Sequence, residues 1–306
     1  MSMRQLAVAS MFVMFIGAAG GCAALRRGPD PDPPPNLSTP GFVIDAHIHY
    51  RPTDEWEREF IEVFEQWNAI GCVLVRMSDL ERGMAFARAN PRRVIPYAQI
   101  DIDSPTVAED IQMVYEMGFR GLGELFAVNE WSYEDPKYNV IWEMAERLGL
   151  PVLPHTGIHA SGVMSKMAPG AFGAIAVRYP DLVIHAAHLG NPWYEEAAEI
   201  ARRNVNVYFD LTGSTLIKKD RDPQYWGTVL WWTDYLGYPH MPRDAVPAFQ
   251  KIVFATDEGP SGFEPNILRF NRMLDANGVP DEIRREMYYG TMARIHGINV
   301  EEYLPQ

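Results

Sequence analysis

Two histidines separated by one residue, His47 and His49, offer the clearest chemistry in this sequence. They lie in an apolar run, and side chains two residues apart on a β-strand point to the same face, so both imidazoles can bind one metal ion from the end of a strand. Three more potential ligands each close a short apolar run further along the chain, namely His155, His188 and Asp257. This spacing predicts a metal site at the mouth of a barrel.

The elements that must position these residues alternate along the chain. Short apolar runs that are typical of buried strands occur at 42–47, 72–76, 94–100, 121–125, 151–155, 182–188, 207–211 and 252–256. Amphipathic stretches that favour helices lie between them, for example at 54–69, 105–117, 138–148, 171–179 and 192–203. This alternation predicts an α/β fold of the (β/α)8 TIM barrel type over residues 41–306. No glycine-rich nucleotide loop follows the first run, which argues against an open doubly wound sheet.

Polar residues interrupt the apolar runs mainly at their carboxyl-terminal ends. They are His47, His49, Glu124, His155, His188, Asp210 and Asp257. Barrel enzymes carry their chemistry at this end of the strands. Burying unpaired imidazoles and carboxylates together would be costly, whereas a divalent cation would satisfy all of them.

Four segments together resemble the signature of the amidohydrolase superfamily. They are DAHIH at 45–49, LPHTG at 153–157, AAHLG at 186–190 and FATDEGP at 254–260. They are most similar to the amidohydrolase-related branch that includes aminocarboxymuconate-semialdehyde decarboxylase and several lactonases. The segment 289–298 resembles the C-terminal helix of that branch, although Met292 stands where asparagine is common.

The resemblance implies that His47, His49, His155 and Asp257 bind Zn²⁺, or alternatively Mn²⁺ or Fe²⁺. His188 would then polarise the substrate or orient the water. The metal would lower the pKa of bound water towards about 7, and Asp257 would act as the general base and then as the acid for the leaving group.

Glu124 has two readings. Binuclear members of the superfamily place a residue that bridges two metals on the fourth strand, and Glu124 occupies that strand. Alternatively, its carboxylate accepts a hydrogen bond from a neighbouring histidine and fixes the tautomer of that ring. We therefore expect one ion and leave a second one open.

Residues around this site carry weaker predictions. Arg51 and Arg76 follow the first two strands and are candidates to bind a substrate carboxylate. The aromatic-rich insertion 213–250 either forms a wall of the substrate pocket or packs on the barrel or on another subunit. His185 precedes His188 by an odd offset, which predicts a structural histidine that faces the helices.

Three functions remain. The first is a metal-dependent hydrolase of a small-molecule amide, ester or lactone. The second is a decarboxylase of a carboxylated aromatic or unsaturated acid, because decarboxylases of the same branch use the same ligands. The third is a lipoprotein that captures a metal or ligand without catalysis. Retention of both His188 and Asp257 argues against the third, since a binding protein needs no proton-transfer pair.

Residues 1–22 have the basic start, apolar middle and small-residue end of a secretory signal. The small residues before Cys22 resemble a bacterial lipoprotein processing box, so we predict lipidation of Cys22 and a proline-rich linker over 23–40. This predicts a location in the bacterial cell envelope, at the periplasmic face and with transfer to the outer membrane permitted, and the lipid as the only membrane contact.

The net charge of −13 disfavours nucleic acid as a partner. Once Cys22 carries lipid, Cys72 has no cysteine left to pair with, so no disulfide is expected. The expected partner is a small-molecule substrate, and the sequence leaves a homo-oligomer open.

Overall fold

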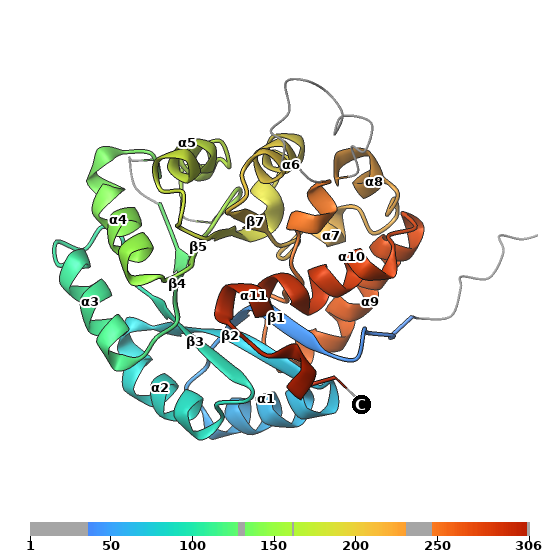
Figure 1. Cartoon of the computed structure of the whole chain (residues 1–306), viewed down its shortest axis with the longest axis horizontal. Helices are drawn as coiled ribbons and strands as arrows, with labels where there is room; N and C mark the ends of the chain where they lie inside the picture. Colours follow the sequence, from blue (N-terminus) through green and yellow to red (C-terminus); the bar gives the residue numbers. More distant parts are fainter. Residues whose placement is uncertain (1–35, 128–131, 161, 231–246, 305–306) are drawn as a thin grey trace, which may run out of the picture. The chain divides into compact units, whose positions relative to one another are not determined.

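Seven parallel strands follow one another in chain order around one curled sheet in the computed structural model (Figure 1). They are β1 (Val43–His49), β2 (Ala69–Arg76), β3 (Val94–Gln99), β4 (Gly121–Leu125), β5 (Val152–Pro154), β6 (Ile184–Ala186) and β7 (Val207–Phe209). The structure describes residues 36–127, 132–160, 162–230 and 247–304. The predicted α/β fold of the TIM-barrel type is confirmed.

The eighth predicted strand, 252–256, fills the gap between β7 and β1 without forming a regular ladder. One parallel bridge joins Phe209 to Ile252, and the Val253 N–H donates to Phe209 O at 2.9 Å. On the other side, the Ala46 N–H donates to Phe254 O at 2.9 Å. The Phe254 N–H turns instead to Met287 O at 2.8 Å, which interrupts the ladder. The segment therefore closes the barrel as extended chain with a single bridge. The prediction of a regular eighth strand was wrong.

Helices lie around the outside of the sheet, except α11 (Thr291–His296), which lies near the centre of the view beside β1 (Figure 1). Those that follow the first six strands are α1 (Asp54–Gln66), α2 (Leu80–Ala89), α3 (Val107–Met117), α4 (Asn139–Leu148), α5 (Ala171–Arg178) and α6 (Tyr194–Arg203). The later ones are α7 (Thr215–Lys218), α8 (Tyr225–Leu230), α9 (Phe263–Ala276), α10 (Asp281–Arg285) and α11 (Thr291–His296). The five helices predicted by residue range are confirmed, with ends that shift by a few residues.

Helix α1 shows why these segments form where they do. The Thr53 side chain accepts a hydrogen bond from the Trp56 N–H, and acidic residues fill the first turn, where they favour the helix dipole. Trp56, Phe60 and Phe64 recur every four residues and are buried. The helix ends before its predicted limit of 69 because Asn68 has a positive φ of 48° and β2 begins at Ala69.

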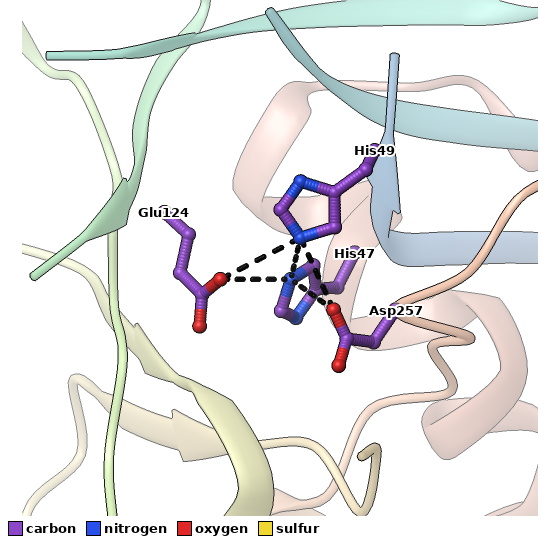
Figure 2. Close-up of side chains that lie close together, drawn as sticks. All are labelled: His47, His49, Glu124 and Asp257. Atoms are coloured by element: carbon purple, nitrogen blue, oxygen red, sulfur yellow. Dashed lines mark hydrogen bonds and ion pairs between the residues drawn. The ribbon is translucent and has the colours of Figure 1, made fainter. Parts of the chain in front are cut away.

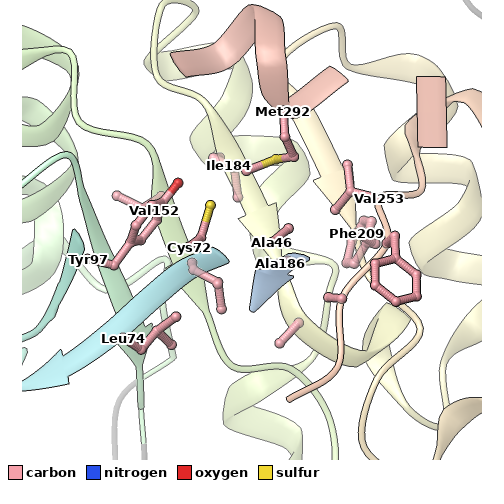
Figure 3. Packing of buried hydrophobic residues seen from close by; sticks show 14 of the residues in the cluster. Ala46, Cys72, Leu74, Tyr97, Val152, Ile184, Ala186, Phe209, Val253 and Met292 are labelled. Carbon is pink, nitrogen blue, oxygen red and sulfur yellow. The ribbon is translucent and has the colours of Figure 1, made fainter. Parts of the chain in front are cut away.

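The barrel interior below the strand ends is apolar. Figure 3 shows side chains from several strands meeting there, with Met292 of α11 beside them. Both small and large side chains are buried there, among them Ala46, Tyr97 and Phe209. Cys72 is buried and free. This interior forms a packed floor beneath the polar residues at the strand ends.

Several predictions fall outside the described residues. They concern the signal segment 1–22, lipidation of Cys22, the linker as far as residue 35, and Trp231, Trp232, Tyr235 and Tyr238 of the insertion. Within the residues that the structure describes, no helix is long and apolar enough to cross a membrane. Of the described insertion, Trp226 is buried and meets Tyr194 of α6 edge to face at 5.2 Å, so this part packs on the barrel.

Candidate metal centre

The histidine pair projects from the carboxyl-terminal end of β1. Its two Nε2 atoms lie 3.3 Å apart, and the rings point towards one another from the strand (Figure 2). His47 is fully buried and His49 is partly exposed. The predicted common direction of the two imidazoles is therefore what the structure shows.

Two carboxylates from distant parts of the chain complete this group (Figure 2). Asp257 Oδ1 lies 3.2 Å from His47 Nε2 and 3.1 Å from His49 Nε2. Glu124 Oε2 lies 3.7 and 3.5 Å from the same two nitrogens. The four ligand atoms all fall within 4.8 Å of one another. Two nitrogens and two carboxylate oxygens around one point form a donor set that suits zinc or manganese.

Glu124 also belongs to a second group. Its other oxygen, Oε1, lies 2.6 Å from His155 Nδ1 and 3.4 Å from His188 Nε2. One carboxylate thus faces the His47–His49 pair with one oxygen and the His155–His188 pair with the other. Both readings of Glu124 that the sequence left open are compatible with this placement.

His155 does not join the first group. Its Nδ1 faces Glu124, and its Nε2 lies 3.2 Å from Ile158 O. The first group therefore differs by one member from the ligand set that the resemblance implied, because Glu124 stands in it where His155 was expected. His155 reaches this group only through the Glu124 carboxylate.

The Asp210 carboxylate contacts three histidines of the site. It follows β7 and is fully buried, with Oδ2 at 3.2 Å from His47 Nδ1 and 3.0 Å from His185 Nε2. Its Oδ1 accepts the His188 backbone N–H at 2.9 Å. Burial raises the pKa of Asp210, but the hydrogen bonds from His185 and His47 outweigh it, so the pKa lies well below its usual value.

The orientation predicted for His185 was wrong. Its ring faces Asp210 instead of the helices. The chain leaves the strand after Ala186 and forms a turn in which His188 has a positive φ of 65°, so strand alternation does not extend to His188. The prediction that His185 is structural agrees with its position, because its ring bonds to Asp210 and belongs to neither group of candidate metal ligands.

Asp45 is a buried site residue for which the sequence predicted no role. Its Oδ1 accepts the His47 and Thr256 backbone N–H groups at 3.1 and 3.0 Å, and its Oδ2 accepts the Thr256 hydroxyl at 2.7 Å. The carboxylate thereby ties β1 to the segment that carries Asp257. Its position as the acidic residue two places before His47 in an apolar run was a signal that could have identified it.

His188 of the second group lies close to Asp257 of the first group. His188 Nδ1 lies 3.9 Å from Asp257 Oδ2 and 2.8 Å from the Thr212 hydroxyl. Both residues have left-handed backbone conformations, with φ of 65° and 58°. Such conformations are costly for side-chain-bearing residues and persist where surrounding contacts fix them. Here Thr212 and the Asp257 N–H bond to His47 O supply those contacts.

Charged neighbours in the site raise the pKa of His47 and lower the pKa values of Asp257 and Glu124. Burial lowers the pKa of His47, but Asp257 and Glu124 outweigh it and raise this pKa well above its usual value. Burial raises the pKa of Asp257, but the charge and hydrogen bond of His47 bring it below its usual value. The pKa of Glu124 is likewise lowered, by His47 and His155 against the effect of burial. The carboxylates are therefore ionised at neutral pH.

The predicted substrate-binding arginines lie outside the two groups. Arg51 and Arg76 are both exposed, two residues beyond β1 and at the last residue of β2. Within the described part of the chain, neither forms an ion pair with an acidic residue. Nearer the centre, the ring of His155 stacks on Phe126 at 5.2 Å and meets His159 edge to face at 5.1 Å.

Residues 77–298 match the model of a protein family described as amidohydrolase. Comparison with curated proteins gives no match.

Solved structures share the fold at low sequence identity. An uncharacterised TIM-barrel protein from Bordetella bronchiseptica is 16% identical with a TM-score of 0.59, over 84% of this chain and 99% of that one. A probable 2-pyrone-4,6-dicarboxylic acid hydrolase from Acinetobacter baumannii, with citric acid bound, is 12% identical with a TM-score of 0.56, over 83% and 99%. A 5-carboxyvanillate decarboxylase from Novosphingobium aromaticivorans, complexed with manganese and 4-hydroxy-3-methoxy-5-nitrobenzoic acid, is 12% identical with a TM-score of 0.53, over 86% and 99%.

Proposed function

This chain belongs to the amidohydrolase family, and from that premise we propose that it is a metal-dependent hydrolase that cleaves an amide, ester or lactone bond of a small molecule. The observation that carries the proposal is the group formed by His47, His49, Glu124 and Asp257, whose ligand atoms lie within 4.8 Å of one another. The group lies at the carboxyl-terminal end of the barrel strands, where enzymes of this fold carry their chemistry.

The residues present fit a divalent cation. Two imidazoles and two carboxylates are largely withdrawn from water, and such groups are costly to bury unless a cation or protons compensate them. His47 and His49 with Asp257 and Glu124 would hold one ion, and Glu124 with His155 and His188 offer a place for a second. Zn²⁺ and Mn²⁺ suit these donors, and Fe²⁺ remains an alternative. A bound divalent cation supplies Lewis acidity, which makes water acidic enough to lose a proton near neutral pH.

Asp257 is the residue to accept the proton from the attacking water. Its Oδ1 faces the histidine pair, while its Oδ2 lies 3.9 Å from His188 Nδ1, so we assign the proton transfer to the second oxygen. The pKa of this carboxyl is lowered, which keeps it ionised at neutral pH. The same group then returns the proton to the leaving group.

His188 is the residue to bind the carbonyl oxygen of the substrate. Thr212 and Asp210 fix its ring and backbone, and Thr215 donates its hydroxyl to His188 O at 2.9 Å. Because these hydrogen bonds fix both the ring and the backbone of His188, the ring is oriented before substrate binds. Such preorganisation contributes to catalysis. Arg51 and Arg76, exposed at the same end of the strands, would pair with a carboxylate elsewhere on the substrate.

A second candidate is decarboxylation of a carboxylated aromatic acid by the same residues. The rings of Phe126, His155 and His159 lie against one another beside the metal centre, which provides an aromatic surface on which a planar substrate would stack. We also propose that lipidated Cys22 anchors the enzyme in the bacterial cell envelope, on the basis of residues 1–22.

Turnover in H₂¹⁸O separates these functions. The metal-loaded chain is screened against esters, lactones, amides and carboxylated aromatics, with Asp257→Asn and His188→Asn as inactive references and Arg58→Gln as a surface control. A hydrolase places one ¹⁸O atom in the product acid, whereas a decarboxylase releases CO₂ and places none in the aromatic product. Bound metal without turnover of any of these compounds would contradict both enzymatic functions and favour a binding protein.

A further inference from the structure

A pocket opens at the opposite end of the barrel from the metal centre. It lies at the amino-terminal ends of β2, β3 and β4, between α2 and the C-terminal segment 296–303. Its volume is about 290 Å³. Ile70, Val94 and Arg120 are the strand-end residues in its wall, while His296 and Tyr303 contribute from the C-terminal segment. Its size is close to the lower limit of small-molecule sites in proteins.

The charge of this pocket is opposite to that of the chain. The whole protein has a net charge of −13, yet Arg88 and Arg120 line the pocket and none of the described residues in its wall is acidic. A cationic lining in an acidic protein favours an anionic ligand.

Both arginines keep most of their donors free of acidic partners. Arg88 Nη2 donates to Met117 O at 2.8 Å, and Arg120 Nη2 donates to His296 O at 3.1 Å. Among the described residues, neither guanidinium forms an ion pair, in contrast to Arg58, Arg82 and Arg284, which pair with carboxylates. A guanidinium has five N–H donors, so each of the two retains donors for a carboxylate.

The inner wall of the pocket is neutral and largely apolar. His296 is buried, and its Nε2 lies 2.9 Å from the Tyr97 hydroxyl. Burial and the charge of Arg120 lower the pKa of His296 to about 3, so the ring carries no charge at neutral pH. Met84, Ile95, Pro96 and Ile298 provide hydrocarbon surface beside it. A matching ligand therefore has an apolar body as well as a negative charge.

We propose that this pocket binds a small organic acid, whose carboxylate pairs with Arg88 and Arg120 and whose hydrocarbon body lies against the apolar wall. The site is distinct from the metal centre, because its strand residues lie at the amino-terminal ends of β2 and β3 while the metal-centre residues stand at the strands' carboxyl-terminal ends. The inference does not depend on the reaction proposed above.

Calorimetric titration of the metal-loaded full chain with cyclohexanecarboxylate tests this site. Three proteins are compared: the wild type, the double variant Arg88→Gln/Arg120→Gln, and the matched control Arg58→Gln/Arg272→Gln, which removes the same charge from exposed surface positions. We expect the wild type and the control to bind the acid, and the Arg88/Arg120 variant to bind at least about tenfold more weakly. Circular dichroism verifies that all three are folded.

Two further ligands determine the chemical class. Cyclohexanecarboxamide has the same shape without the charge, and inorganic phosphate has the charge without the hydrocarbon body. We expect the amide not to bind and phosphate to bind more weakly than the acid. The proposal is overturned if the acid does not bind the wild type, if it binds the Arg88/Arg120 variant equally well, or if the amide or phosphate binds as tightly as the acid.

Discussion

The two halves of the barrel hold their site residues in different ways. Strands β1 to β4 have 7, 8, 6 and 5 residues, whereas β5, β6 and β7 have 3 each and the eighth segment forms a single bridge. His47, His49 and Glu124 lie on the strands of the first half. His188 and Asp257 lie beyond the short strands of the second half, with positive φ.

Where the strand ladder is short, hydrogen bonds from buried side chains hold the site residues in place. In the first half, parallel pairing of β1 with β2 reaches His49, with a register shift between Asp45 and Ile48 around His47. In the second half, Asp210 bonds to the His188 N–H, and Asp45 bonds to Thr256 next to Asp257. The comparison teaches that the ligands of the first half lie on strands, with Asp45 and Asp210 bonding to His47, whereas the proton-transfer pair lies beyond the strands and is held by carboxylates of neighbouring segments.

Loss of a ligand from either half should have the largest effect. We expect His49→Asn and Asp257→Asn each to lower kcat/KM by about 10²–10⁴-fold, because the first removes a metal ligand and the second removes both a ligand and the proton acceptor. Steady-state kinetics and metal content by mass spectrometry measure the two effects. Arg58→Gln serves as control and should match the wild type. Wild-type metal content and turnover in His49→Asn would show that the group is not the functional centre.

Loss of a positioning carboxylate should come next. Asp210→Asn removes the acceptor of His47 and His185, and we expect metal affinity to fall about 10–100-fold. Asp45→Asn should cost less, because burial raises the pKa of Asp45 to about 7 and its carboxyl is already partly neutral at that pH. Competition with a chromogenic chelator ranks the two variants. A larger loss for Asp45→Asn would reverse the assignment of the main positioning role to Asp210.

The affinity for metal should rise with pH. Without metal, burial lowers the pKa values of His47 and His49, but contacts with Asp257 and Glu124 outweigh it and raise them above the ordinary value. Protons therefore stay on these rings to higher pH, and a cation must displace them. We expect affinity to increase about tenfold per pH unit for each proton released, below the raised histidine pKa values. Chelator competition between pH 6 and 8 measures this slope, and an affinity that is constant or falls with pH would contradict the expectation.

A methyl group beside His188 should have the smallest effect. Gly213 and Gly149 have similar positive φ values of 59° and 66°, so alanine at either position should lower the free energy of unfolding by about 1 kcal/mol. Only at Gly213 would the new Cβ lie 3.1 Å from His188 Nδ1, whereas Gly149 faces open space. We expect Gly213→Ala alone to lower turnover several-fold. Equal turnover in both variants, measured beside chemical denaturation, would show that the position of His188 tolerates this displacement.

Local patterns were enough to predict the barrel, the outer helices and the histidine pair on β1. Strand alternation predicts that His47 and His49 face one side, and their Nε2 atoms lie 3.3 Å apart in the structure. Alternation failed at His185, because the turn after Ala186 breaks the period before His188. The eighth strand was predicted too regularly, because the bond from the Phe254 N–H to Met287 O depends on a segment far along the chain.

Long-range partners explain what the sequence left open in the site. The role of Glu124 stayed divided because its two oxygens face different histidine pairs, which only the closed barrel brings together. Asp45 had no assigned role because its partner Thr256 is 211 residues away. The placement of His155 next to Glu124, outside the first group, likewise depends on how β4 and β5 meet.

An anomalous difference map from crystals of the zinc-loaded protein tests the central claim most directly. We expect one strong peak at about 2.0–2.2 Å from His47 Nε2, His49 Nε2, Glu124 Oε2 and Asp257 Oδ1. A second, weaker peak between Glu124 and the His155–His188 pair would be compatible with the account. A map with no peak at the first position under saturating zinc, or with zinc bound only at other residues, would contradict it.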